Sequence, residues 1–168
     1  QHVATRPCLR RRACQRVEVL TVRGPKRTDL IDHVFHYGEA GDVPIAGDWN
    51  GDGIRQIGVF HDGEWYLDLD GDGKFTERDK SFHFGQAGDI PVIGDFNGDG
   101  VDEIGVFHDG KWIVDSNGNR RLDAQDKVFE LGGAGDKPVV GDWNDDGTDD
   151  PGVFHPGKGA DHVARRAG

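Results

Sequence analysis

The sequence contains no methionine and only two cysteines, Cys8 and Cys14. The missing methionine leads us to expect a chain that is not a complete translation product. Two cysteines make no disulfide framework, so a local disulfide and two unrelated free thiols are both open interpretations. No apolar run approaches the roughly 18 residues that a transmembrane helix needs, so we predict no membrane span.

Helical periodicity and the common catalytic motifs are also missing. No segment repeats its apolar residues at helical spacing over ten or more positions. The sequence has no nucleophile elbow, no glycine-rich phosphate loop and no zinc-ligand spacing, and we therefore predict that it is not an enzyme. Glycine, in contrast, is abundant: its 27 copies are about twice the usual share and indicate a chain dense in turns.

The net charge of −11 is distributed unevenly along the chain. Residues 1–30 carry eight Lys and Arg against two acidic residues, whereas the rest carries 12 against 29, a net charge of −17. The acidic part argues against a nucleic-acid-binding surface. The basic part lacks interleaved aromatic residues, and we interpret 1–30 as a tail that is disordered or not native to the rest.

An internal repeat organises the remainder. Related segments begin at offsets of 47 residues: GEAGDVPIAGDWN at 38, GQAGDIPVIGDFN at 85 and GGAGDKPVVGDWN at 132. Such a period determines the architecture. We predict repeat units at 31–77 and 78–124, a truncated unit at 125–158 and a tail at 159–168. The repeat becomes unreadable towards both ends, so we expect a fragment or a chain with altered ends.

Each unit contains four short apolar runs separated by turn signals. In the middle unit they span 80–84, 91–96, 103–108 and 111–115, and each has the length and composition of a strand. Asp-Gly at 62–63 and 109–110 separates two such runs, which favours a tight hairpin. The predicted fold is all-β: tandem four-stranded antiparallel blades of a partial β-propeller, with too few blades for the minimum of about four that a closed ring needs.

One loop per unit presents oxygen-bearing side chains at alternate positions and then a glycine. Positions 1, 3 and 5 of the three loops are Asp48, Asn50 and Asp52; Asp95, Asn97 and Asp99; and Asp142, Asn144 and Asp146. Position 7 would offer a backbone carbonyl from Ile54, Val101 or Thr148, and position 9 is Gln56, Glu103 or Asp150. Calcium takes 6 to 8 oxygen ligands of these kinds. The alternative is a set of Asx turns without metal, but three loops in register favour calcium.

A second type of loop follows the fourth strand of a unit. Its candidate ligands, at an EF-hand-like spacing, are Asp68, Asp70, Asp72, the carbonyl of Lys74, and Asp79. Asp79 replaces the usual bidentate glutamate and reaches less far, so we predict a weaker metal site. The next unit has Asp115, Asn117, Asn119 and Asp126, with Arg120 in place of glycine. There we predict a polar turn without metal.

Histidine and tryptophan also recur. His61, His108 and His155 lie 47 residues apart, and we interpret them as polar strand ends rather than transition-metal ligands. Trp49, Phe96 and Trp143 occupy one repeat position, which favours packing between blades over stacking on sugars.

The middle unit resembles a known repeat. The order Phe84-Gly85, Gly88-Asp89-Ile90-Pro91, DFNGDG at 95–100 and EIGV at 103–106 is similar to the FG-GAP/VCBS repeats of integrin α-subunit propellers and many bacterial surface proteins. The resemblance covers residues 31 to about 158. It departs from the family where Asp89 and its counterparts replace alanine, and where Tyr37 and Leu131 stand in the place of Phe84. It implies a propeller and calcium.

These observations lead to an expected function. We expect an extracellular or cell-surface module, from a bacterial protein, that binds calcium and acts as a structural or adhesion-type scaffold, with a protein or polysaccharide ligand on its loops. Extracellular modules work with calcium sites of about 10⁻⁴–10⁻³ M. The alternative is an accessory propeller of a carbohydrate-active or other secreted enzyme. A catalytic site would need a carboxylate pair outside the repeat pattern, and the repeat explains nearly every acidic residue.

Overall fold

The computed structural model describes residues 18–21 and 31–157, and this part of the chain is all-β, without a helix. The strands are β1 (Glu18–Thr21), β2 (Ile31–Val34), β3 (Val43–Gly47), β4 (Gln56–His61), β5 (Glu64–Leu67), β6 (Lys80–His83), β7 (Ile90–Gly94), β8 (Glu103–His108), β9 (Lys111–Val114), β10 (Lys127–Glu130), β11 (Lys137–Gly141) and β12 (Asp150–Phe154). Strand β1 belongs to the predicted basic tail. The rest of that tail, both cysteines and residues 159–168 lie outside the described residues.

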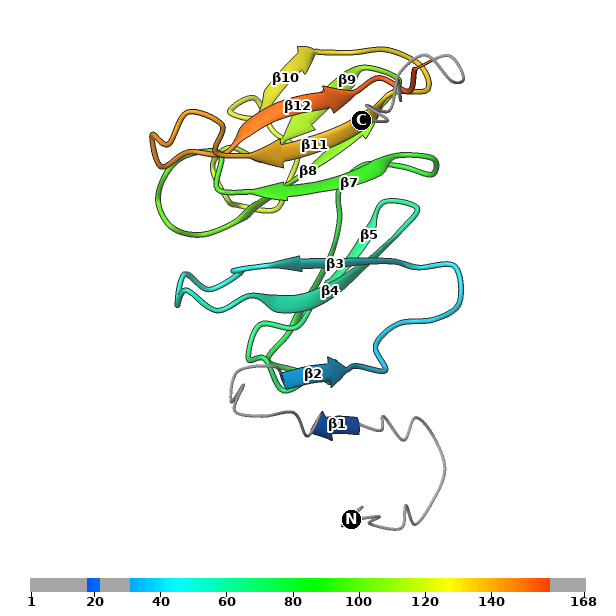
Figure 1. The fold of residues 1–168 in the computed structure, drawn as a ribbon, viewed down its shortest axis with the longest axis vertical. Helices are drawn as coiled ribbons and strands as arrows, with labels where there is room; N and C mark the ends of the chain where they lie inside the picture. The colour runs from blue at the N-terminus through cyan, green and yellow to red at the C-terminus, as the bar shows by residue number, and fades with distance from the viewer. Residues whose placement is uncertain (1–17, 22–30, 158–168) are drawn as a thin grey trace, which may run out of the picture.

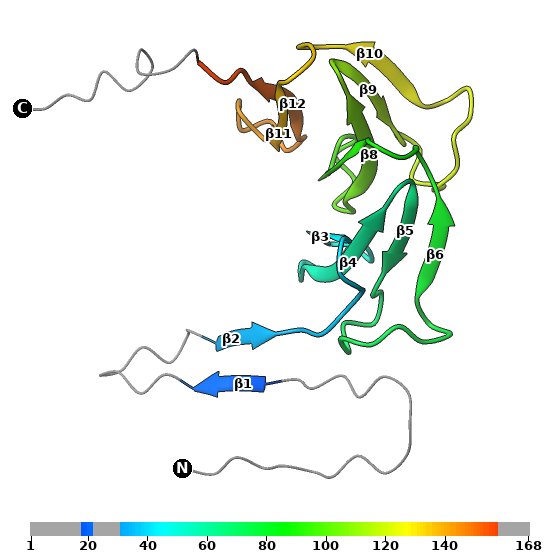
Figure 2. The same ribbon diagram turned by 90° about the vertical axis from the view of Figure 1, so that its right-hand side faces the viewer.

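The strands form antiparallel sheets in which sequence neighbours are also spatial neighbours. Strands β3 to β6 form one four-stranded sheet and β7 to β10 a second, while β11 and β12 pair with each other, as do β1 and β2. Figure 2 shows the sheets fanning around an arc, with β3 and β11 on its concave side and β6 and β10 on its outside. No sheet closes on itself among the described residues. The predicted all-β antiparallel class is confirmed.

The first strand pair has the same register in three sheets. Val43 pairs with Phe60, Ile90 with Phe107, and Lys137 with Phe154. Asp62 and Asp109 have φ of 48° and 47°, and the glycine after each also has positive φ. This is the backbone that a two-residue hairpin turn requires, so the hairpins predicted at both Asp-Gly pairs are confirmed.

A buried tryptophan organises each four-stranded sheet. Trp65 and Trp112 are fully buried, and each indole N–H donates a hydrogen bond to a backbone carbonyl, that of Phe84 at 2.8 Å or Leu131 at 3.0 Å. Trp65 packs edge-on against Phe60, on the neighbouring strand β4. The indole therefore buries its large ring without leaving its polar N–H unpaired.

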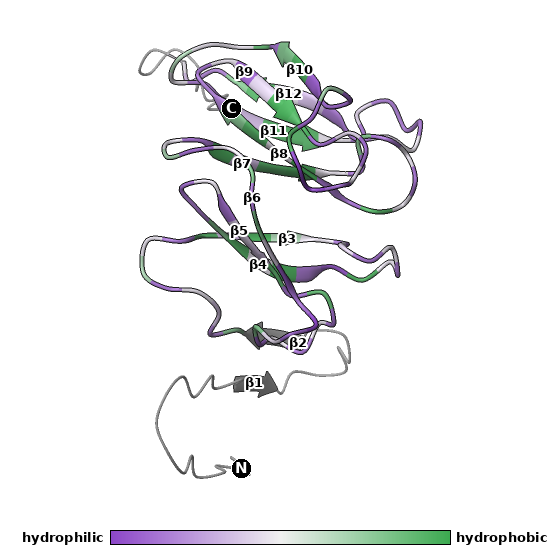
Figure 3. Ribbon diagram, turned by 180° about the vertical axis from the view of Figure 1, so that it is seen from behind, coloured by the Kyte–Doolittle hydropathy of each residue, from purple (hydrophilic) through white to green (hydrophobic). Residues whose placement is uncertain are grey.

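Apolar side chains also pack from sheet to sheet. Trp49, at 3% exposure, belongs to one buried cluster with Ile104 and Val106 of the following sheet. Phe96 is buried in a cluster that Val140 and Val153 also contact. The innermost strands β3, β7 and β11 are stacked in this way (Figure 1). The hydropathy colouring shows hydrophobic stretches along the inner strands β7 and β11 and mostly hydrophilic connecting loops (Figure 3).

Trp143 occupies the same repeat position as Trp49 and Phe96 but is 62% exposed. The described part of the chain contains no sheet after β11 and β12, so nothing there covers this ring. Packing between neighbouring sheets is therefore observed for Trp49 and Phe96 and not for Trp143.

The central strands require glycine where a neighbouring strand crosses closely. A Cβ atom added at Gly105 would lie 2.9 Å from the carbonyl oxygen of Ile113, whereas at Gly152 the nearest atom is a flexible methyl of Val139 at 3.1 Å. We expect Gly105→Ala to destabilise the fold by about 1–3 kcal/mol, the usual cost of overpacking. Gly152→Ala is the matched control and should cost clearly less. Urea unfolding of both variants tests this, and equal losses would contradict it.

Candidate metal centres in the acidic loops

The three repeated acidic loops connect equivalent strands. They join β3 to β4, β7 to β8 and β11 to β12. Loop position 1 directly follows a strand, and position 9 begins the next strand. The antiparallel register pairs the residue before position 1 with position 9: Gly47 with Gln56, Gly94 with Glu103 and Gly141 with Asp150. Strand pairing therefore brings the two ends of each candidate ligand set together.

The first carboxylate of each loop closes the turn. Asp95 accepts hydrogen bonds from the backbone N–H groups of Gly98, Asp99 and Gly100 at 2.7, 3.1 and 2.8 Å. Asp48 makes the same three contacts in the first loop, and Asp142 makes the last two in the third. Gly100 has φ of 86°, which a residue with a side chain rarely adopts. These contacts are Asx-type turns, and they aim the position-1 carboxylate into the loop.

The middle loop gathers three carboxylates. Oxygens of Asp95, Asp99 and Glu103 lie within 4.8 Å of one another, and Glu103 is 97% buried with an exposure of 3%. Glu103 accepts hydrogen bonds from the backbone N–H of Phe96 at 2.9 Å and the amide of Asn97 at 2.7 Å. Burial, reinforced by the charges of Asp99 and Asp95, raises the pKa of Glu103 to about 8. The negative charge of this cluster is therefore unfavourable unless a proton or a cation neutralises part of it.

In the first loop, the amide of Gln56 occupies the position of the Glu103 carboxylate. Gln56 is 6% exposed, its carbonyl oxygen accepts the N–H of Trp49 at 3.1 Å, and its NH₂ lies 3.4 Å from Asp52. Asn50 also donates to Asp52, at 3.1 Å. Amide hydrogens thus stand where the middle loop has a third carboxylate. The first loop therefore has less need of a cation.

The third loop is more open. Asn144 accepts the N–H of Asp146, and the hydroxyl of Thr148 donates to Asp146, which lowers the pKa of that carboxyl. Asp150 begins β12 and is half-buried. Among the described residues, the loop does not belong to a cluster of three acidic groups whose oxygens lie within 4.8 Å.

The position-7 residues contribute their N–H groups to the turn. The amides of Ile54 and Val101 each donate at 2.8 Å to the position-5 carboxylate, as does Thr148 at 2.9 Å. Metal ligation by their carbonyl oxygens stays a prediction.

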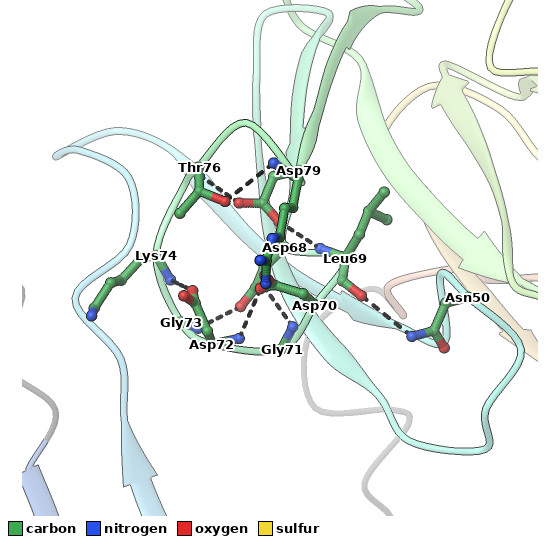
Figure 4. Close-up of polar contacts among 11 residues, drawn as sticks. Asn50, Asp68, Leu69, Asp70, Gly71, Asp72, Gly73, Lys74, Thr76 and Asp79 are labelled. Carbon is green, nitrogen blue, oxygen red and sulfur yellow. Dashed lines mark hydrogen bonds and ion pairs between the residues drawn. The ribbon is translucent and has the colours of Figure 1, made fainter.

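The loop between β5 and β6 forms the second acidic cluster (Figure 4). Oxygens of Asp68, Asp70 and Asp79 lie within 4.8 Å of one another, and Asp68 and Asp79 are buried. Asp68 accepts the N–H groups of Gly71 and Gly73 at 2.8 Å, and Asp79 accepts that of Leu69 at 2.9 Å. Burial raises the pKa of Asp68. Asp72 lies outside this triad and accepts the N–H of Lys74 at 2.8 Å.

The corresponding loop of the next unit has a different chemistry. Arg120 adopts φ of 62° at the glycine position, and its N–H donates to the buried Asp115 at 2.6 Å. The side-chain amides of Asn117 and Asn119 donate to Asp123 at 3.2 and 2.6 Å. The Arg120 guanidinium reaches the carbonyl oxygen of Trp49, 3.3 Å away in the preceding unit. Protein hydrogen-bond donors rather than a cluster of carboxylates fill this loop. Asp126 accepts the N–H of Asp123 at 2.8 Å.

Sequence reasoning missed the residue at position 8 of the acidic loops. Asp102 accepts the N–H of Asp48 at 2.8 Å and returns its own N–H to the Asp48 carbonyl at 2.9 Å. Asp149 forms the same reciprocal pair with Asp95, at 2.9 and 2.8 Å. These bonds join each acidic loop to the next one. The available signal was the substitution at this position, where Arg55 stands in the first unit and aspartate in the other two.

The recurrent histidines contact carboxylates of the turns. The Nδ1 atoms of His61 and His108 lie 2.9 Å from Asp42 and Asp89, and His155 contacts Asp136. Each histidine thus pairs with an aspartate 19 residues earlier. These contacts agree with the interpretation of the histidines as polar strand ends.

No family model, curated protein or solved structure matches this chain. The described residues contain no helix long and apolar enough to cross a membrane.

The Glu103 cluster predicts a specific pH dependence. In chelator, folded Glu103 keeps its proton up to a pH of about 8, whereas the ordinary pKa is 4.5. The folded state then holds more protons than the unfolded state, so stability should fall as pH rises between these values. Urea unfolding at several pH values with chelator measures this slope.

Two further measurements identify the group responsible. Glu103→Gln should reduce the slope without abolishing it, because burial also raises the pKa of Asp68, Asp102 and Asp115. Millimolar calcium should flatten the slope of the unaltered protein. A slope that Glu103→Gln leaves unchanged would show that Glu103 is not the titrating group.

Proposed function

We propose that this chain is a calcium-stabilised extracellular or cell-surface repeat module that acts as a structural or adhesion-type binding scaffold. The observation that carries the proposal is the difference between the first and middle loops. At one position the first loop has the amide of Gln56, which donates to Asp52, and the middle loop has the buried carboxylate of Glu103 beside Asp95 and Asp99. A buried carboxylate that lies beside two others is costly unless a cation or a proton compensates its charge.

Calcium suits the donor set. The candidate ligands are carboxylate, amide and backbone carbonyl oxygens, without histidine or cysteine in the loops. Hard cations of calcium's size prefer such ligands, whereas zinc and copper favour nitrogen and sulfur. In the middle loop the ligands would be Asp95, Asn97, Asp99, the carbonyl of Val101, and Glu103. A bound ion would supply positive charge among these groups and hold the strand connection closed.

We further propose that the sheets are blades of a β-propeller of the FG-GAP/VCBS type. The repeated register of the three inner strand pairs supports this, as does the arc along which the sheets are arranged. The −17 net charge of residues 31–168 would be compensated best where calcium is plentiful, because weak sites of about 10⁻⁴–10⁻³ M fill only outside the cytosol. That is the basis for an extracellular location.

Metal binding is tested by calorimetry on metal-free protein with calcium, magnesium and zinc. We expect calcium to bind most tightly and to raise the melting temperature above its value in chelator, because a ligand of the native state stabilises it by mass action. Magnesium should restore little of this stability. An unchanged melting curve, or tighter binding of zinc than of calcium at the loops, would overturn the proposal.

The three acidic loops should differ in calcium affinity. We expect Asp95→Ala to cost more calcium affinity and more thermal stability than Asp48→Ala or Asp142→Ala, because the middle loop has three carboxylates and lies in a complete four-stranded sheet. The three variants are compared at one fixed calcium concentration. A larger loss for Asp48→Ala would contradict the charge argument, and a larger loss for Asp142→Ala, whose loop lies in a two-stranded sheet, would contradict the rigidity argument.

Gln56→Glu provides the matched gain-of-function test. It places in the first loop the carboxylate that Glu103 supplies in the middle loop, and it removes the amide that donates to Asp52. The variant should be less stable than the unaltered protein in chelator and should gain calcium affinity. Equal stability of the two proteins in chelator would show that the carboxylate cluster is not costly.

A further inference from the structure

Two cavities occupy equivalent places in the two four-stranded sheets. The first, of about 440 Å³, lies beside β4 and β5, and the second, of about 250 Å³, lies beside β8 and β9. Their walls correspond at the repeat offset of 47: both include the glycine that follows Tyr37 or Phe84, and both include a histidine paired with a turn aspartate. The fold therefore builds this cavity twice, and the side chains around it distinguish the copies.

Aromatic side chains line the first cavity. Tyr37, Tyr66 and Phe75 contribute to its wall. The rings of Tyr66 and Phe75 meet edge-on with centroids 5.5 Å apart, and the two residues are 36% and 47% exposed. In the second cavity the residues equivalent to Tyr66 and Phe75 are Ile113 and Leu122. Only the first cavity thus combines three aromatic rings.

The two cavities also differ in the charge of the side chains that line them. Glu39, Asp42 and Glu64 line the first cavity, and no lysine or arginine among the described residues does so. The equivalent residues of the second cavity are Gln86, Asp89 and Lys111, whose formal charges cancel. Neighbours hold two of the acidic groups in place: Asp42 accepts the N–H of Glu39 at 2.8 Å, and Glu64 lies 2.8 Å from His83.

We propose that the first cavity binds a small organic ammonium ion. Aromatic faces attract ammonium groups within about 6 Å of the ring centroid, and the three carboxylates add a net negative field. The volume falls in the range of small-molecule sites, about 300–1,000 Å³. This inference specifies a ligand class for the binding role in the proposed function and rests on that role, but none of its acidic wall residues is a proposed calcium ligand.

The test compares two probes of the same shape on the full chain in saturating calcium. Choline carries a quaternary ammonium, and 3,3-dimethylbutan-1-ol replaces the nitrogen with carbon. We expect choline to bind at one site per chain in calorimetry and the neutral alcohol to bind at least about tenfold more weakly, because only choline gains cation–π attraction. N-acetyl-lysine amide, titrated in parallel, distinguishes a free small molecule from a lysine side chain as the source of the ammonium. Equal affinity for choline and the alcohol, or no binding of any ammonium at millimolar concentration, would overturn the proposal.

Variants copied from the second cavity locate the site. Glu64→Lys and Tyr66→Ile introduce the residues that the second unit carries at these positions, where the strand pairing is the same. Each should weaken choline binding at least about tenfold. Glu130→Lys, at an exposed position on β10 away from the cavity, should not. The triple variant Lys111→Glu, Ile113→Tyr and Leu122→Phe should gain choline binding at the second cavity.

The melting temperature of each variant in calcium and in chelator separates the two proposals. A variant that loses choline binding but keeps its calcium-dependent stability supports the cavity and leaves the calcium proposal intact. Loss of calcium-dependent stability in the unaltered protein, with choline binding retained, would overturn the calcium proposal alone. Unchanged choline binding in Glu64→Lys would overturn the cavity assignment. Glu64→Gln keeps a hydrogen-bonding partner for His83 and serves if Glu64→Lys is unstable.

Discussion

The reciprocal hydrogen bonds between successive acidic loops are the constraint on which the arrangement of the sheets depends. The carboxylate of Asp102 accepts the backbone N–H of Asp48, and the N–H of Asp102 donates to the Asp48 carbonyl. Asp149 forms the same two hydrogen bonds with Asp95. The same innermost strands approach closely: a Cβ at Gly94 would lie 2.6 Å from Val140 and 2.8 Å from Asp149. Polar contacts at the loops and close packing along the strands therefore hold neighbouring sheets together. Trp49 and Phe96 are buried in clusters that include side chains of the next sheet.

Crowding so many carboxylates at strand connections creates an electrostatic cost, and the loops compensate it in different ways. Gln56 supplies amide hydrogens in the first loop, and Asn117 and Asn119 do so in the loop that begins at Asp115. In the middle loop, the partners of Glu103 are the N–H of Phe96 and the amide of Asn97, and two further carboxylates remain beside it. The loop between β5 and β6 also gathers three carboxylates, those of Asp68, Asp70 and Asp79. The Arg78 guanidinium lies 3.8 Å from the carboxylate of Asp70. The case for a cation is therefore strongest at these two loops.

Divergence between the copies indicates where a repeat acquires a specific role. The two cavities share a backbone frame and a histidine–aspartate pair, yet one is aromatic and acidic while the other is aliphatic and electrically balanced. Positions that both four-stranded units share, such as the Asp-Gly hairpins at 62–63 and 109–110, serve the fold. Positions that differ, such as Glu64 against Lys111, are free of that requirement and can serve a ligand.

Local pattern by itself determined the strands, the hairpins at Asp62 and Asp109, and the closure of the acidic loops, because each depends on residues close in sequence and on strand register. Even there, β6, β7 and β9 end at His83, Gly94 and Val114, before the predicted 84, 96 and 115. Only the tertiary structure decided that Asp102 holds Asp48, that Arg120 reaches Trp49, that Trp143 is exposed, and that three aromatic rings and three carboxylates surround one cavity. These contacts join residues of different sheets or loops. Their distances depend on the angle between packed sheets and on the paths of the connections, which the spacing of residues along the chain does not encode.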